Sequence, residues 1–135
     1  MTDYRVDASS SIPLIHQIAR QIRARIARGE LGAGEALPPV RELGLHLAVN
    51  FNTVAKAYRL LEKEGLVTIR RGLGASVGGL STLPGRAWDD EALLEDIEDL
   101  VSRYALSGGD LSRLAGLFAR ALENQHGKVR SEHNV

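Results

Sequence analysis

The side chains best suited to bind an anionic polymer lie in two short segments, VNFNTVAKAYR at positions 49–59 and RRGLG at positions 70–74. Asparagine and lysine donate hydrogen bonds to base edges, asparagine suiting adenine and lysine guanine. Threonine hydroxyls and the backbone amides at a helix start suit phosphates. This chemistry predicts a surface for duplex DNA, formed by Asn50, Phe51, Asn52, Thr53, Lys56, Arg59, Arg70, Arg71 and Gly72.

Each of these side chains also has a purely structural interpretation. Asn52 and Thr53 are typical of helix-capping residues. Lys56 suits a solvated helix face, and Arg59 precedes Glu62 by three residues, a spacing that favours an ion pair along a helix. The arginines at 70–71 also suit an ordinary surface hairpin. The DNA-binding prediction therefore depends on the order and spacing of the whole set.

Apolar periodicity predicts the elements that must position these side chains. Apolar residues recur every four positions from Leu14 to Ile26, which predicts an amphipathic helix that Pro13 opens and Gly29 ends. An extended stretch with two prolines follows, because residues before proline avoid the helical region. A short second helix is then expected over 40–47.

The third helix carries most of the candidate contacts. A tight turn over 48–50 precedes it, and we expect it to run over 52–64 and to stop at Gly65. The apolar period then changes to two, which predicts strands over 66–71 and 75–79. This order is typical of a winged helix-turn-helix, whose third helix lies in the DNA major groove. The predicted inner face consists of Val54, Tyr58 and Leu61, with Asn50 as the cap.

The last third of the chain predicts two further helices with apolar faces. Gly108 and Gly109 separate them, and Asp110 caps the second. Two helices are too few to enclose a core, so we expect a second copy to complete a four-helix arrangement. Packing back onto the N-terminal domain of the same chain is the alternative. The predicted dimerisation residues are Leu93, Ile97, Leu100, Val101, Tyr104, Leu111, Leu114, Phe118 and Leu122.

The expected fold is mainly α with a small β-wing. A loose N-terminal arm (1–12) precedes the winged helix-turn-helix DNA-binding domain (13–79). A linker (80–88), a helical dimerisation region (89–124) and a flexible tail (125–135) complete the 135 residues.

Composition narrows the classes of function. The chain has no cysteine, which excludes a disulfide scaffold, a thiolate zinc site and a cysteine nucleophile. Residues 1–80 hold 11 Lys and Arg against 7 Asp and Glu, a net of +4, and residues 81–135 hold 6 against 10, a net of −4. DNA would therefore be attracted to one end of the chain. No apolar run is long enough to span a membrane and no signal peptide is evident, so we expect a cytoplasmic location and no membrane partner.

An enzyme is the main alternative from another class. The four histidines are scattered along the chain, and GLGASVGG lacks the lysine of a phosphate-binding loop. The acidic residues between 89 and 99 are more typical of a solvated helix face than of a metal site. We therefore expect no catalytic residue, no metal and no cofactor.

The stretch from Pro13 to about Val77 resembles the DNA-binding domain of GntR-family bacterial regulators. The matching segments are PLIHQIARQIRARIARGEL, GEALPPVREL, VNFNTVAKAYRLLEKEGLV and RRGLGASV. They are most similar to the YtrA-like subfamily, whose members dimerise through a short C-terminal region of two helices. The resemblance implies a homodimer that represses its own operon, which commonly encodes a transporter. Two DNA-binding heads related by a two-fold axis would require a palindromic operator.

The resemblance also implies that Arg41 contacts DNA from the second helix. This sequence departs from the family pattern at three positions: Pro39 replaces a serine, Phe51 replaces a basic residue or proline, and Leu73 replaces a basic residue. The Phe51 ring either packs against a thymine methyl or folds inward. Two alternatives stay open for the whole chain, a small-molecule site at the dimer or domain interface and a winged-helix protein-interaction module that does not bind DNA.

Overall fold

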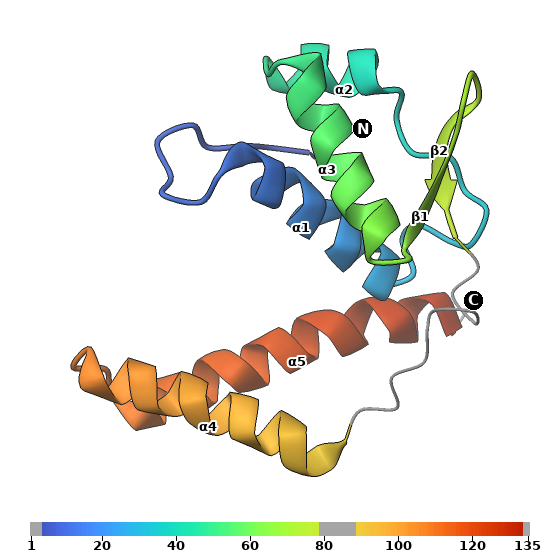
Figure 1. Cartoon of the computed structure of the whole chain (residues 1–135). Coiled ribbons are helices and arrows are strands. Elements are labelled where there is room, and N and C mark those ends of the chain that lie inside the picture. The colour runs from blue at the N-terminus through green and yellow to red at the C-terminus, as the bar shows by residue number, and fades with distance from the viewer. Residues whose placement is uncertain (1–3, 79–88, 134–135) are drawn as a thin grey trace. The chain divides into compact units, whose positions relative to one another are not determined.

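The computed structural model describes residues 4–78 and 89–133 (Figure 1). The chain divides into two compact units, Met1–Pro84 and Gly85–Val135. In the described ranges the chain forms five helices and one two-stranded antiparallel sheet, so the predicted fold class is confirmed. The predicted linker, residues 80–88, lies outside the described residues.

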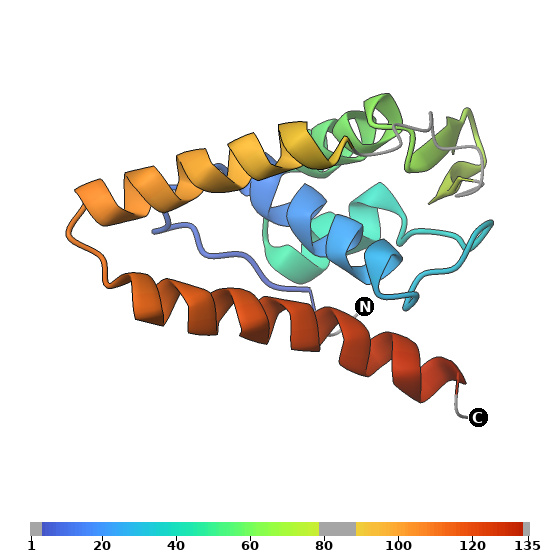
Figure 2. The same ribbon diagram turned by 90° about the horizontal axis from the view of Figure 1, so that it is seen from below.

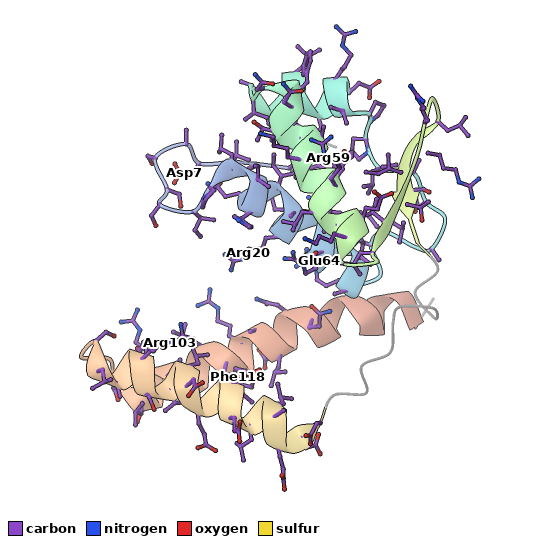
Figure 3. The ribbon with its side chains drawn as sticks, in the orientation of Figure 1. Asp7, Arg20, Arg59, Glu64, Arg103 and Phe118 are labelled. Atoms are coloured by element: carbon purple, nitrogen blue, oxygen red, sulfur yellow. The ribbon has the colours of Figure 1, made fainter. Side chains whose placement is uncertain are left out.

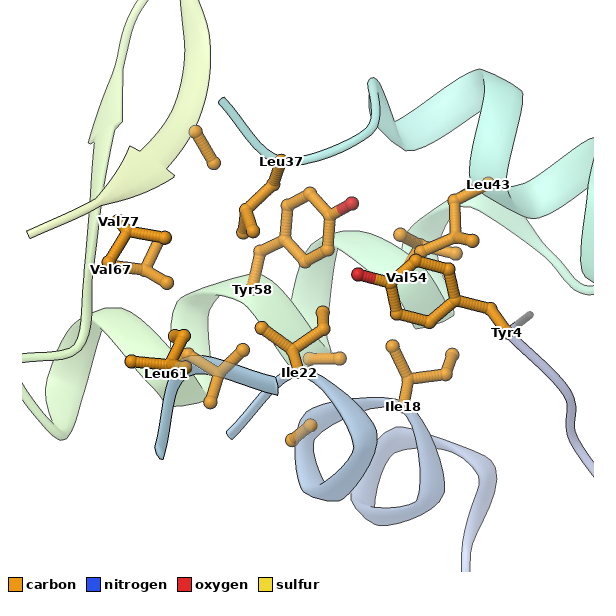
Figure 4. Close-up of a cluster of buried hydrophobic side chains, with 14 residues drawn as sticks. Tyr4, Ile18, Ile22, Leu37, Leu43, Val54, Tyr58, Leu61, Val67 and Val77 are labelled. Carbon is orange, nitrogen blue, oxygen red and sulfur yellow. The ribbon is translucent and has the colours of Figure 1, made fainter. Parts of the chain in front are cut away.

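The first unit is a three-helix core with a small β-ribbon. It contains α1 (Leu14–Ala27), α2 (Val40–Leu47) and α3 (Phe51–Lys63), followed by β1 (Val67–Arg70) and β2 (Gly74–Val77). Apolar residues spaced three or four apart give each helix one face that avoids water, and these faces meet in a common core. The largest fully buried side chains, drawn in Figure 4, are Ile18 and Ile22 of α1, Leu43 of α2, and Val54 and Leu61 of α3.

A tight turn sets α3 against α2. Ala48 ends α2 in the left-handed conformation, with φ at 56°, which few residues other than glycine adopt. Asn50 then caps α3, because its side-chain oxygen accepts a hydrogen bond from the Asn52 amide at 2.8 Å. This confirms the predicted cap. The helix begins at Phe51, one residue earlier than predicted, and Gly65 follows its end with φ at 84°, as expected.

The wing is a ribbon anchored by a third chain segment. β1 and β2 pair antiparallel from Val67 opposite Val77 to Arg70 opposite Gly74. The extended stretch between α1 and α2 pairs with the other edge of β2, since Leu37 donates to the Ala75 carbonyl and Val77 to the Glu35 carbonyl, both at 2.9 Å. The sequence predicts the extended stretch but not this pairing, which holds the base of the wing against the helical core.

The N-terminal arm is docked, so its prediction as a loose segment is wrong for the described residues 4–12. Tyr4 is buried in the core at 4% exposure. The side-chain amide of Gln21 bonds both the amide and the carbonyl of Arg5, and that of Gln17 bonds both backbone groups of Asp7. Two glutamines one helical turn apart thus supply the hydrogen-bond partners that a neighbouring strand would give to the backbone of the arm.

The second unit is a helical hairpin. α4 (Asp90–Leu106) and α5 (Leu111–His133) run antiparallel, as Figures 1 and 2 show. Asp89 and Asp110 accept hydrogen bonds from the first-turn amides of α4 and α5, which confirms Asp110 as a cap. The α5 backbone stays helical to His133, whereas the sequence predicts a helical region that stops at residue 124 and a tail from residue 125.

Candidate nucleic-acid interface

α3 separates an inner apolar face from an outer polar face. Val54, Tyr58 and Leu61 are buried, as predicted. Asn52, Lys56 and Arg59 are exposed, and their spacing of four and three residues puts them in one row along the helix. Figure 3 labels Arg59 on this helix. The row therefore presents one amide and two cations to solvent.

Backbone amides at the start of α3 contribute less than the sequence predicts. The Asn52 amide is bonded to the Asn50 side chain, and the Thr53 amide donates to the Asn50 carbonyl at 2.9 Å. Because both donors already have partners within the chain, they are not free to bind a phosphate. The half-buried Thr53 keeps only its hydroxyl for such a contact. α2 differs, because it begins after Pro39 with no side-chain cap.

A groove of about 370 Å³ lies between α3 and the wing. Arg59 contributes to it from α3 and Arg71 from the wing tip, and both are exposed. Small residues line part of it, among them Ala55, Gly74 and Ala75. The Glu62 carboxylate and apolar side chains also line the groove, so its two guanidinium groups are the part of it suited to an anion. Beyond it, Arg70, Gly72 and Leu73 are exposed at the wing tip.

Two hydrogen bonds fix the wing and the segment before α2 to α3. The Glu62 carboxylate accepts from the Ile69 amide of β1 at 3.0 Å. The Tyr58 hydroxyl donates to the Pro38 carbonyl at 2.5 Å, and burial raises the pKa of Tyr58 above its ordinary range. Glu62 thus binds the wing, and in the part of the chain that the structure describes it forms no ion pair with Arg59. The sequence gives no signal for either bond.

The side chain of Phe51 folds inward, which settles the question left open by the sequence. Its ring lies against Gly44 of α2, so closely that an added Cβ on Gly44 would be 2.5 Å from the Phe51 Cδ1 atom. The Arg41 guanidinium carbon lies 5.3 Å from the ring centroid, within the range of a cation–π contact. Arg41 is exposed and Phe51 is half-buried. The role of Gly44 could not be inferred from sequence, because it depends on a contact made across the turn.

The hairpin of the second unit keeps an apolar face uncovered within that unit. No residue of α4 is buried. Phe118, labelled in Figure 3, is 50% exposed, and Leu111 is 51% exposed. A hollow of about 240 Å³ lies on this face. Among the predicted dimerisation residues, Leu93, Ile97, Val101, Tyr104 and Leu114 are half-buried, and Leu100, Leu111, Phe118 and Leu122 are exposed.

Other kinds of site are not evident in the described ranges, 4–78 and 89–133. Within them, no three His, Asp or Glu side chains gather closely enough to ligate a metal ion. Within the same ranges, every helix is too short or too polar to cross a bilayer.

The chain matches known bacterial regulators over its first unit. A family model described as bacterial regulatory proteins, gntR family, matches residues 14–77. The HTH-type transcriptional repressor YtrA of Bacillus subtilis (strain 168) is 40% identical over 73 residues, which cover 54% of this chain and 56% of that relative. The chain thus spans little more than half the length of this relative.

Two solved structures extend the comparison. YtrA from Sulfolobus acidocaldarius, a GntR-family transcription factor, matches with a TM-score of 0.56 and 34% identity over 72% of this chain and 96% of that one. AraR(DBD) in complex with operator ORX1 matches with a TM-score of 0.50 and 25% identity over 54% of this chain and 92% of that one. Because nearly all of the Sulfolobus protein is covered at this identity, the chain belongs to the gntR family of bacterial transcriptional regulators.

Proposed function

We propose that this protein binds a specific duplex DNA sequence with the outer face of α3 in the major groove. The observation that carries the proposal is the exposed row of Asn52, Lys56 and Arg59, beside a groove that Arg71 closes on the wing side. Asparagine and lysine in such a row suit base edges. The AraR domain that this chain resembles was solved on its operator, which supports the same role here.

The remaining candidate residues fit phosphate contacts that set the position of the protein on the duplex. Arg41 extends from α2, whose first turn lacks a side-chain cap. Arg70, Arg71 and Gly72 lie at the wing tip, where the glycine has no side chain to hold the backbone away from DNA. Thr53 offers its hydroxyl, and Asn50 keeps its amide nitrogen for a contact while its oxygen caps α3.

We also propose that two copies assemble through the apolar face of the α4–α5 hairpin. A single helix in the major groove contacts few base pairs, and a two-fold pair doubles that contact and requires a palindromic operator. Burying the half-exposed Phe118 and Leu111 in a four-helix bundle would remove apolar surface from water. Packing of the same face onto the first unit is the competing arrangement.

Repression is the regulatory outcome that we propose. The similarity to the Bacillus relative YtrA, a transcriptional repressor, supports this proposal. A dimer bound at a promoter blocks transcription of the genes downstream. We propose that these genes are the protein's own operon and encode a transporter, and that the protein acts in the cytoplasm.

The test of DNA binding starts with a library of random duplexes from which the full-length protein selects its operator. Lys56→Ala and Arg41→Ala should then weaken binding to the selected duplex while the protein stays folded and dimeric. A base contact contributes about 1–3 kcal/mol, so Lys56→Ala should weaken binding about five- to 150-fold. Arg20→Ala is the matched control, because it removes one exposed cation from α1. Equal effects of Lys56→Ala and Arg20→Ala would contradict the assignment of α3.

Salt dependence separates a regulator from a protein-interaction module. Phosphate contacts release counterions, so the affinity for the selected duplex should fall steeply as salt rises. If no sequence is enriched and binding is weak at every salt concentration, the module without DNA binding is the better explanation.

The test of assembly places a charge on the exposed apolar face of the hairpin, at a side chain that is 50% exposed in the single chain. Phe118→Glu should turn the dimer into a monomer in sedimentation experiments and should weaken operator binding. Leu106→Glu is the matched control, because Leu106 is 89% exposed and lies at the end of α4, outside the predicted face. A Phe118→Glu protein that remains a dimer would rule out this interface.

A further inference from the structure

Arg41, Phe51 and Gly44 form a three-residue cluster at the junction of α2 and α3, in which the aromatic ring contacts both the guanidinium and the glycine. The Arg41 guanidinium carbon lies 5.3 Å from the ring centroid. The position that a Cβ would take on Gly44 is 2.5 Å from the ring Cδ1 atom. The ring therefore occupies space that any residue other than glycine would fill.

The backbone on either side of Phe51 also determines where this ring lies. Phe51 is the first residue of α3, directly after the Asn50 cap, and the left-handed Ala48 fixes the turn that brings α3 back against α2. A hypothetical Cβ on Gly44 would also be 3.2 Å from the Val49 carbonyl oxygen, so the turn and the ring close on Gly44 together. The backbone thus places the Phe51 Cα against α2, and the ring fills the space left open by the missing side chain of Gly44.

Arg41 gains its orientation from the ring. In the described ranges, no Asp or Glu carboxylate lies within salt-bridge distance of Arg41, which is exposed. An exposed arginine otherwise samples many rotamers and loses that freedom when it binds. A ring face beneath the guanidinium restricts those rotamers before any ligand arrives, and the planar guanidinium suits such stacking.

We propose that Phe51 is a positioning residue for DNA binding: its ring, seated on Gly44, orients the Arg41 guanidinium toward the duplex and makes no base contact of its own. This inference depends on the proposed function, since it assigns a role within that interface. Phe51 then orients Arg41 instead of contacting DNA itself, and Gly44 contributes by leaving room for the Phe51 ring.

The test is a double-mutant cycle on the duplex that the wild-type protein selects. Phe51→Leu keeps an apolar side chain on Gly44 but removes the π face. A cation–π contact at an exposed site is worth about a two- to fivefold change in affinity, so Phe51→Leu should weaken binding by that factor. The loss should vanish when Arg41→Ala is already present, and Phe51→Tyr should restore wild-type binding because it keeps the ring. Circular dichroism checks that each variant is folded.

Arg59 provides the matched control for coupling. It is an exposed arginine of the same proposed interface, and it lies at the end of the α3 row that is farther along the helix from Phe51. The effects of Phe51→Leu and Arg59→Ala should therefore add, whereas those of Phe51→Leu and Arg41→Ala should not. A Phe51→Leu loss that persists in the Arg41→Ala background, or no loss at all, would overturn the inference, as would Phe51→Tyr binding as weakly as Phe51→Leu.

A measurement without DNA separates this inference from the proposed function. A ring face beneath the guanidinium shifts the Arg41 Nε–H proton resonance upfield, and Phe51→Leu should abolish that shift. An unshifted resonance in the wild-type protein overturns the stack even if the protein binds its operator. A shifted resonance in a protein that selects no duplex rejects the DNA-binding function, and the positioning role is rejected with it.

Discussion

The hydrogen bond from Tyr58 to Pro38 links α3 to the extended stretch that precedes α2 and pairs with β2. Tyr58 is only 2% exposed, and its hydroxyl lies 2.5 Å from the Pro38 carbonyl oxygen. Tyr58→Phe keeps the ring in the core and removes the donor. A buried acceptor without its partner costs about 1–3 kcal/mol. Because Pro38 is only half-buried, water can replace part of the bond, and we expect about 1–2 kcal/mol of lost stability.

This loss corresponds to a fall in Tm of about 4–16 °C for a domain of 60–100 residues. Urea denaturation measures the free energy of unfolding. Hydrogen exchange followed by mass spectrometry shows whether the segment 34–38 opens before α3 does. Tyr104→Phe is the matched control, because it removes the same hydroxyl from the second unit and should leave the exchange of the first unit unchanged. An unaltered midpoint and unaltered exchange at 34–38 in Tyr58→Phe would refute the structural role of this bond.

Three further perturbations test other contacts. The Ile69 amide should exchange faster in Glu62→Ala but stay protected in Glu62→Gln, which keeps an acceptor oxygen; equal exchange in both would remove Glu62 as the anchor of the wing. Gln21→Ala should expose the Arg5 segment to protease and cost about 1 kcal/mol of stability, and a protease-resistant arm would contradict its docking by Gln21. Because burial raises the pKa of Tyr58, the unfolded chain ionises first, so stability should hold below about pH 10 and fall above it. In Tyr58→Phe, urea midpoints measured from pH 8 to 11 should fall less steeply.

The helices and their inner faces could be predicted from the sequence because local periodicity determines them. The apolar spacing of α3 identifies Val54, Tyr58 and Leu61 as core residues, and Asn50 has the side chain that a cap requires. The exposed row on the opposite face follows from the same spacing, so the position of Lys56 and Arg59 was predictable too.

Contacts made by polar side chains across the fold could not be predicted. Gln17 and Gln21 occupy positions that a hydrophobic pattern assigns to solvent, yet they satisfy the backbone of the arm and bring Tyr4 into the core. The inward position of the Phe51 ring depends on Gly44, seven residues earlier, and on the left-handed conformation of Ala48 between them. The glutamine contacts depend on where the arm lies in the fold and the Phe51 contact depends on backbone geometry at the turn, neither of which residue types alone specify.

The anchoring of the wing also bears on how the protein behaves at high concentration. A free ribbon exposes unpaired amides and carbonyls along both sides, and such edges recruit strands from other molecules. Here the Glu35–Leu37 stretch pairs with the outer edge of β2. On the opposite edge of the ribbon, the Glu62 carboxylate accepts a hydrogen bond from the Ile69 amide of β1. Two wings brought close together on neighbouring DNA sites would therefore find few open backbone groups near their bases, which disfavours edge-to-edge aggregation.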